Sequence, residues 1–88
     1  MKITQSTQAG TLQSSDLIVF VEPADSLEIE IESTVSRQFG HLIRQRVEDV
    51  IRRLNVEQGR IRVSDRGALD YAIEARVETA LRRAEVQS

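Results

Sequence analysis

Apolar and polar residues alternate along the first third of the chain, and this pattern predicts β-strands. Residues 17–21 are rich in β-branched and aromatic side chains, as is typical of a buried strand. Pro23 follows this segment and is expected to end it, because proline cannot donate a hydrogen bond to a sheet ladder. Residues 27–32 alternate apolar residues with glutamates, so one side is expected to face a core and the other water. Residues 9–12 are a weaker candidate for a further, earlier strand.

Steps of three and four residues between apolar positions then predict a helix of about five turns. Ser33 and Thr34 are expected to cap its start. Asn55 is expected to end it in a left-handed conformation. The apolar stripe of this helix consists of Val35, Phe39, Leu42, Ile43, Val47, Val50, Ile51 and Leu54.

A short strand and a second helix complete the pattern. Residues 60–63 alternate arginine with isoleucine or valine, and in the turn after them Ser64 or Asp65 is expected to cap the helix. We therefore predict an α+β fold in a single domain spanning residues 1–88. It comprises a small, mostly antiparallel sheet, with three N-terminal strands plus one short strand, packed against two helices. The apolar side of the second helix consists of Leu69, Ala72, Ile73, Val77, Ala80, Leu81 and Ala84.

The residue types that are missing exclude several kinds of chemistry. The 88 residues include no cysteine, so disulfides and thiolate catalysis are excluded and any thiol must be attached to the chain. A single histidine, His41, cannot form a histidine metal cluster within one chain and is interpreted as a surface residue. No apolar run is long enough to span a membrane, and no signal peptide begins the chain. We therefore expect a cytoplasmic protein with no membrane partner.

Charge is divided unevenly along the chain. Residues 1–34 contain one lysine and six acids, net −5, whereas residues 35–88 contain eleven arginines and eight acids, net +3. The arginines have two interpretations: a solvated helix surface, or a site for an acidic partner or for phosphates. The second interpretation predicts a docking role for Arg44, Arg46, Arg52 and Arg53.

No catalytic group of residues is evident, which predicts a chain that does not catalyse a reaction by itself. Glu28, Glu30 and Glu32 are too regularly spaced to suggest an acid–base pair and are expected to face water. The glycines stand alone and form no phosphate-binding loop. The polar segment 11–16 is predicted to connect two strands, and it would expose its serine hydroxyls. Taken alone, such a Ser-Ser-Asp segment is typical of an ordinary turn.

Several stretches together resemble one known family. Residues 9–16, Ala-Gly-Thr-Leu-Gln-Ser-Ser-Asp, resemble the N-terminal signature of the acyl carrier (gamma) subunits of citrate lyase. Residues 33–35 and 38–40 resemble the start of that family's long helix, and residues 65–70 with 75–76 resemble its second characteristic stretch. The likeness extends in order over essentially the whole chain. Where the family often has a cysteine this chain has Tyr71, a difference expected to affect packing rather than function.

The resemblance implies that Ser14 carries a covalent prosthetic group, making the chain a phosphoprotein. That group is a phosphoribosyl dephospho-coenzyme A, joined to the serine by a phosphodiester. Ser15 has the same chemistry, and only the position in the motif favours Ser14. The resemblance further implies that the attached thiol carries acetyl and citryl groups as thioesters.

The same resemblance implies the partners of the chain. They are the alpha subunit (acyl transferase) and the beta subunit (lyase) of a complex that cleaves citrate to oxaloacetate and acetate, and a prosthetic-group transferase that attaches the arm. The carrier itself breaks no bond. Its implied contribution is tethering, which raises the effective concentration of the carried group at two active sites.

Three alternatives remain. The chain could be the acyl carrier subunit of malonate decarboxylase, which uses a similar prosthetic group. It could be a structural adaptor with no attached group. A nucleic-acid-binding module is suggested by the arginines but disfavoured by a pI of about 5.4 and by the three aromatic residues, at least two of which are expected in the core. We expect no nucleic-acid partner.

Overall fold

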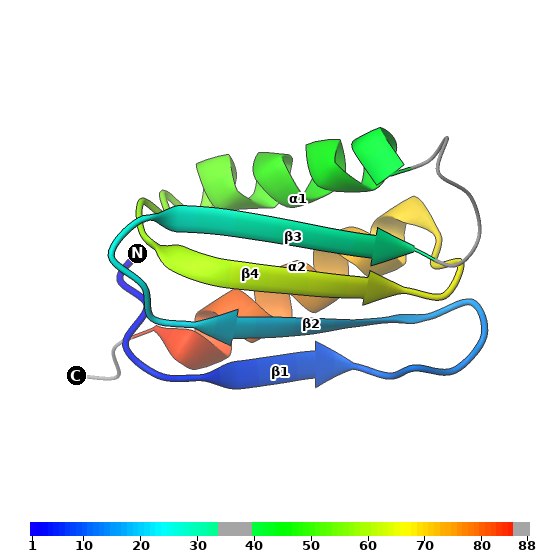
Figure 1. Cartoon of the computed structure of the whole chain (residues 1–88), viewed down its shortest axis with the longest axis horizontal. Helices are drawn as coiled ribbons and strands as arrows, with labels where there is room; N and C mark the ends of the chain where they lie inside the picture. The colour runs from blue at the N-terminus through cyan, green and yellow to red at the C-terminus, as the bar shows by residue number, and fades with distance from the viewer. Residues whose placement is uncertain (34–39, 86–88) are drawn as a thin grey trace.

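The computed structural model describes residues 1–33 and 40–85, in which four strands and two helices form two layers (Figure 1). This arrangement confirms the predicted α+β fold. The first strand begins and ends earlier than the weak candidate at residues 9–12. In chain order the elements are β1 (Thr7–Gly10), β2 (Leu17–Glu22), β3 (Leu27–Ser33), α1 (Gly40–Arg53), β4 (Gly59–Asp65) and α2 (Asp70–Ala84).

The sheet has the strand order β1-β2-β4-β3, so β4, the last strand in the sequence, lies inside the sheet. β2 pairs antiparallel with both β1 and β4, whereas β3 and β4 are parallel. A parallel pair needs a long crossover connection, and α1 lies in the segment that connects β3 to β4. The sheet is therefore mostly antiparallel, as predicted.

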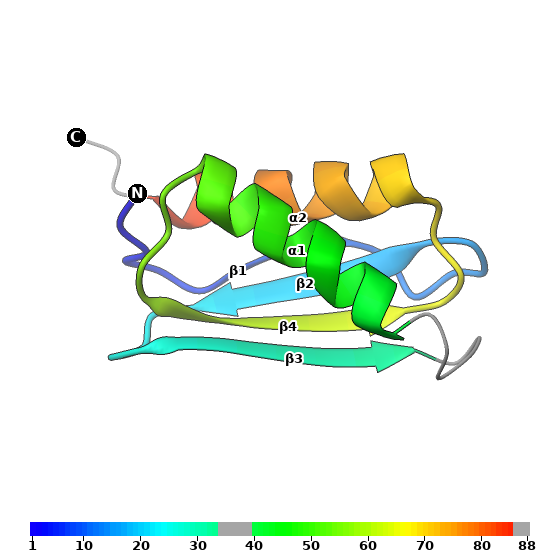
Figure 2. The same cartoon turned by 90° about the horizontal axis from the view of Figure 1, so that it is seen from above.

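Both helices cover the same face of the sheet (Figure 2). α2 packs over β1 and β2, and α1 packs against α2 and β3. A fully buried side chain of valine, leucine or isoleucine contributes about 1.5–3 kcal/mol to stability. The largest fully buried side chains come from β2, β4 and both helices: Leu17, Val19, Val21, Val47, Val50, Ile61, Val77 and Leu81.

Among the described residues, no helix covers the other face of the sheet, and Figure 1 views the molecule from this open face. Along β2 the buried residues alternate with half-buried ones, so Ile18 and Phe20 face the open side. Glu28, Glu30 and Glu32 of β3 are exposed, as predicted. The apolar side of this edge strand is only partly buried.

The start of α2 differs from the prediction, whereas the start of the first helix is not tested. Ser33 is the last residue of β3, and its hydroxyl donates a 2.9 Å hydrogen bond to Asp65 Oδ2. The other residues expected at that helix start, including Thr34, Val35 and Phe39, lie outside the described residues. α2 begins after Leu69, which makes no side-chain cap. Because β4 continues to Asp65, neither Ser64 nor Asp65 lies next to the helix.

Asn55 has a φ of 55° and confirms the predicted left-handed residue after α1.

The expectation that at least two of the three aromatic residues lie in the core was wrong. Phe20 is half-buried on the open face, and Tyr71 is 72% exposed, so neither lies in the core. Tyr71 therefore contributes little to the packing of this chain, contrary to the prediction.

No helix among the described residues is long and apolar enough to cross a membrane.

Candidate functional site

The serines singled out in the sequence lie in the loop between β1 and β2, residues 11–16. Ser14 and Ser15 are both exposed. The loop lies at the end of the molecule where β3 and β4 finish and α2 begins (Figure 1). Within the described part of the chain, the Ser14 hydroxyl has no hydrogen-bond partner, so it is open to chemistry from outside.

A tight turn of the backbone starts the loop. Gly10 has a φ of 99°, and a Cβ atom there would lie 1.9 Å from the carbonyl oxygen of Leu17. The Thr11 N–H donates a 3.0 Å hydrogen bond to that same oxygen. Glycine is therefore required at position 10, because any side chain would push the two ends of the loop apart.

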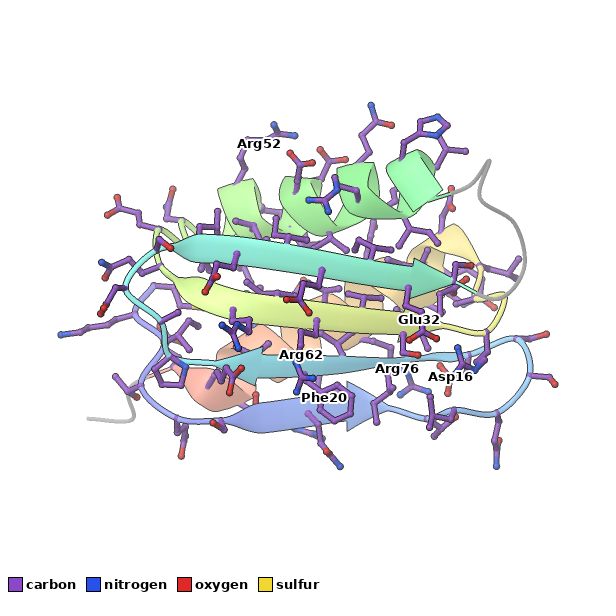
Figure 3. All side chains as sticks on the ribbon, in the orientation of Figure 1. Asp16, Phe20, Glu32, Arg52, Arg62 and Arg76 are labelled. Atoms are coloured by element: carbon purple, nitrogen blue, oxygen red, sulfur yellow. The ribbon has the colours of Figure 1, made fainter. Side chains whose placement is uncertain are left out.

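Asp16 joins the loop to helix α2. Its carboxylate accepts hydrogen bonds from the Thr11 hydroxyl (2.6 Å) and the Leu17 N–H (2.7 Å). It also accepts two bonds from the Arg76 guanidinium, 3.2 Å from Nε and 3.1 Å from Nη2 (Figure 3). The Thr11 hydroxyl, the Leu17 N–H and the Arg76 guanidinium together hold the pKa of Asp16 below its usual range, although partial burial opposes them. Such charge-assisted, bidentate contacts are among the stronger hydrogen bonds in proteins.

The backbone after β4 holds the other side of the loop. The Ser15 N–H donates a 2.8 Å hydrogen bond to the Arg66 carbonyl, and the Arg66 N–H donates a 2.9 Å bond to the Asp16 carbonyl. Ser15 has a φ of 66°, a conformation that these bonds stabilise. Asp65 is buried and accepts hydrogen bonds from the N–H groups of Gly67 and Ala68, which shapes the segment that carries Arg66.

Two of the stretches that resemble the family, residues 9–16 and residues 65–70 with 75–76, thus meet around one loop. Residues 9–16 form it, residues 65–68 bond to its backbone, and Arg76 binds its carboxylate. Sequence reasoning named Asp16, Arg66 and Arg76 only as parts of motifs and assigned them no role. No local pattern could have found the Asp16–Arg76 pair, because sixty residues separate its two members.

The other residues considered in the sequence do not form a site with this loop. His41 is exposed in the first turn of α1. Within residues 1–33 and 40–85, no group of three histidine, aspartate or glutamate side chains could hold a metal ion.

The arginines proposed for docking have partners within the chain. Arg44 donates to the Ile29 carbonyl, and Arg46 pairs with Asp70. Arg52 and Arg53 likewise pair with acidic residues of the helices, Asp49 and Glu78. This pairing favours the solvated-surface interpretation.

Comparison with known proteins identifies close relatives. The family model described as the malonate decarboxylase delta subunit matches residues 4–84. The citrate lyase acyl carrier protein of Haemophilus influenzae (strain PittEE) is 50% identical over 84 residues, covering 96% of this chain and 88% of the relative. That of Pectobacterium atrosepticum is 52% identical over 85 residues with the same coverage. That of Halothermothrix orenii is 44% identical and is covered to 90%.

Solved structures share the fold. A chain of a Pseudomonas malonate decarboxylase hetero-tetramer in complex with malonate aligns with a TM-score of 0.68 and 21% identity, over 97% of this chain and 93% of that one. The RNase P protein of Staphylococcus aureus aligns with a TM-score of 0.56 and 14% identity, over 88% and 83%. At these identities the likeness concerns the fold alone, so the second structure is no argument for nucleic-acid binding. The relatives at 44–52% identity carry the assignment, and on their evidence the chain belongs to the family of the citrate lyase acyl carrier proteins.

Proposed function

We propose that this chain is the acyl carrier subunit of a citrate lyase, and that Ser14 carries a phosphoribosyl dephospho-coenzyme A arm. The relatives that cover nearly the whole chain are citrate lyase acyl carrier proteins by name. One structural observation carries the proposal. Ser14 presents an exposed hydroxyl, with no hydrogen-bond partner among the described residues, on a loop whose neighbouring residues are bonded to Arg66 and Arg76.

The loop suits a large covalent group. An exposed hydroxyl can enter the active site of an attaching enzyme, and a group joined there extends into solvent without displacing core residues. Ser15 is also exposed, but its N–H is bonded to the Arg66 carbonyl and its φ is positive. Ser14 is favoured by its place in the motif and by the absence of such a restraint among the described contacts.

The chain's own residues would position the arm. When bound, the arm supplies a terminal thiol, which this cysteine-free chain lacks. Asp16 and Arg76 hold the loop in one place relative to α2, so its attachment point is the same for each partner. The proposed partners in the complex are the acyl transferase (alpha) and lyase (beta) subunits, which would share one tethered carrier at high effective concentration. A separate proposed partner is the prosthetic-group transferase that attaches the arm.

Intact mass spectrometry of protein purified from its own host tests this proposal. We expect an added mass that matches the arm, lost completely in Ser14→Ala and retained in the matched control Ser15→Ala. Added mass that persists in Ser14→Ala and disappears in Ser15→Ala would move the attachment by one residue. Host protein without added mass, in cells that cleave citrate, would contradict the proposal and leave the adaptor interpretation.

The acyl carrier subunit of malonate decarboxylase is the second candidate. The description of the matching family model favours it. The identity of 44–52% to citrate lyase carriers, against 21% to that neighbour, favours citrate lyase. Loaded protein combined with each set of partner subunits should support cleavage of citrate and not decarboxylation of malonate.

A further inference from the structure

The open face of the sheet has a hollow beside the Ser14 loop. Its volume is about 380 Å³, which lies within the range of small-molecule pockets. Leu12 of the loop and Ile18 and Phe20 of β2 provide apolar walls. Glu30 of β3 and Arg62 of β4 provide polar groups in the same hollow. Figure 3 looks onto this face, with Phe20 and Arg62 near its centre.

The charged groups on either side of the central row are paired. Arg60 Nη1 lies 3.2 Å from Glu22 Oε1, and Arg60 Nε lies 3.5 Å from Glu28 Oε2. Nearer the loop, Arg66 Nη1 lies 3.3 Å from Glu32 Oε1. The charged groups on the two flanks of the open face therefore already have partners within the chain.

The central row is different. Glu30, Arg62 and Phe20 lie directly opposite one another on β3, β4 and β2. Among the described residues, neither Glu30 nor Arg62 forms an ion pair. The Arg62 guanidinium carbon instead lies 5.1 Å from the centroid of the Phe20 ring. An aromatic ring, a guanidinium and a carboxylate are therefore all available to a ligand in one hollow.

We propose that this hollow binds a purine nucleotide. The nucleotide part of the arm on Ser14 would be its natural occupant, an inference that rests on the proposed function. Phe20 and Arg62 offer the flat faces on which bases stack. Glu30 can accept a hydrogen bond from an exocyclic amine of the base. The Arg62 guanidinium can also bind a phosphate oxygen.

The attachment point is within reach of the hollow. Leu12 lines the hollow and is two residues from Ser14, so their Cα atoms are at most about 8 Å apart. The nucleotide also lies nearer to the attachment point than the thiol does, because the thiol ends the arm. A short tether gives an effective concentration of millimolar order, so even a millimolar site would be substantially occupied. The docked nucleotide would leave only the outer, thiol-bearing part of the arm free to move.

Titration of free dephospho-coenzyme A into unloaded protein tests the hollow itself. We expect the NMR signals of the Phe20 ring and the Arg62 side chain to shift, with a dissociation constant of about millimolar order. Phe20→Leu and Arg62→Gln should each weaken binding about tenfold, within the range measured for the loss of one stacking partner. The matched control is Arg52→Gln, an exposed arginine on α1 in the other layer (Figure 3), which should bind as the wild type does.

Loaded protein tests the tethered state. With the arm's mass verified on Ser14, the Phe20 and Arg62 signals should differ from those of unloaded protein, and Arg62→Gln should reduce the change at Phe20. This inference would be overturned if the NMR signals of Phe20 and Arg62 were unchanged in protein with a verified arm and also did not respond to about 10 mM free dephospho-coenzyme A. The proposed function would then remain intact. Absence of the arm would refute the proposed function and the tethered state together, and the free titration would still decide whether the hollow binds nucleotides.

Discussion

Asp16 is the residue on which the geometry of the Ser14 loop most depends. Its side chain is only 16% exposed and is held by the Thr11 hydroxyl, the Leu17 N–H and the Arg76 guanidinium. Neutralising it would leave a charged arginine without its partner and would loosen the loop from α2. Gly10 matters for a different reason, because the backbone at the loop's start leaves no room for a side chain.

Asp16→Asn should lower the free energy of unfolding by about 1.5–3 kcal/mol near neutral pH, the usual worth of a hydrogen bond to a charged group. The folded state lowers the pKa of Asp16 from its ordinary value of 3.8. Its contribution is therefore fully present above that value and is lost as the pH falls below it. The difference between variant and wild type should narrow below about pH 4 in urea denaturation. Asp25→Asn, in the connection between β2 and β3, is the control and should show no such difference. If the difference in the free energy of unfolding between Asp16→Asn and wild type stayed constant into strong acid, the stabilising role of the ionised Asp16 carboxylate would be contradicted.

Gly10→Ala should destabilise the protein by at least about 1–3 kcal/mol, the cost of a residue held in an unfavourable backbone region. The steric conflict with the Leu17 carbonyl adds to this cost. Gly40→Ala is the matched control, because a Cβ atom there meets nothing within 4 Å. Thermal denaturation of both variants measures the contrast. Equal stability of the two variants would show that the tight turn at position 10 is not needed.

At the scale of elements, α2 links the core to the loop. Its inner side is buried against β1 and β2, and the same helix presents Arg76 to Asp16. Its first turn behaves differently, because Tyr71 projects into solvent. Loop geometry therefore depends on the inner side of this helix and not on its exposed first turn.

Leu81→Ala should lower the free energy of unfolding by about 2–5 kcal/mol, because Leu81 is fully buried and its loss leaves a cavity. Tyr71→Ala, in the same helix, should change it by less than about 0.5 kcal/mol. Chemical denaturation of the pair measures the two effects. A large loss in Tyr71→Ala would restore the packing role that the sequence suggested.

At the scale of the whole molecule, the Ser14 loop is far from the N-terminal segment and from the end of α2. The molecule is 38 Å long, and the N-terminal segment and the end of α2 lie at the end opposite the Ser14 loop (Figure 1). There Ile3 pairs with Glu85, and the Thr4 N–H donates to the Ala84 carbonyl. Additions to the C-terminus should therefore leave the loop accessible.

A C-terminal affinity tag should leave loading of Ser14 unchanged. Intact mass spectrometry of tagged and untagged protein from the same host measures the loaded fraction of each. A markedly lower fraction in the tagged protein would indicate that the attaching enzyme contacts the far end of the molecule as well as the loop.

From the sequence alone, the type and order of most elements and the candidate serine could be predicted, whereas the bounds of the first strand and the start of α2 could not. The spacing of apolar residues indicates which side of each element is covered, because side chains repeat with a period of two in strands and 3.6 in helices. This holds for the alternation in residues 27–32 and 60–63 and for the helical spacing in residues 69–84. The family resemblance directed attention to Ser14. Only the tertiary structure decided that β4 pairs parallel with β3, that Arg76 holds Asp16, and that Phe20, Arg62 and Glu30 meet on an open face. These features depend on contacts between residues distant in the chain. A local pattern records whether a side chain is covered, but not which residue covers it.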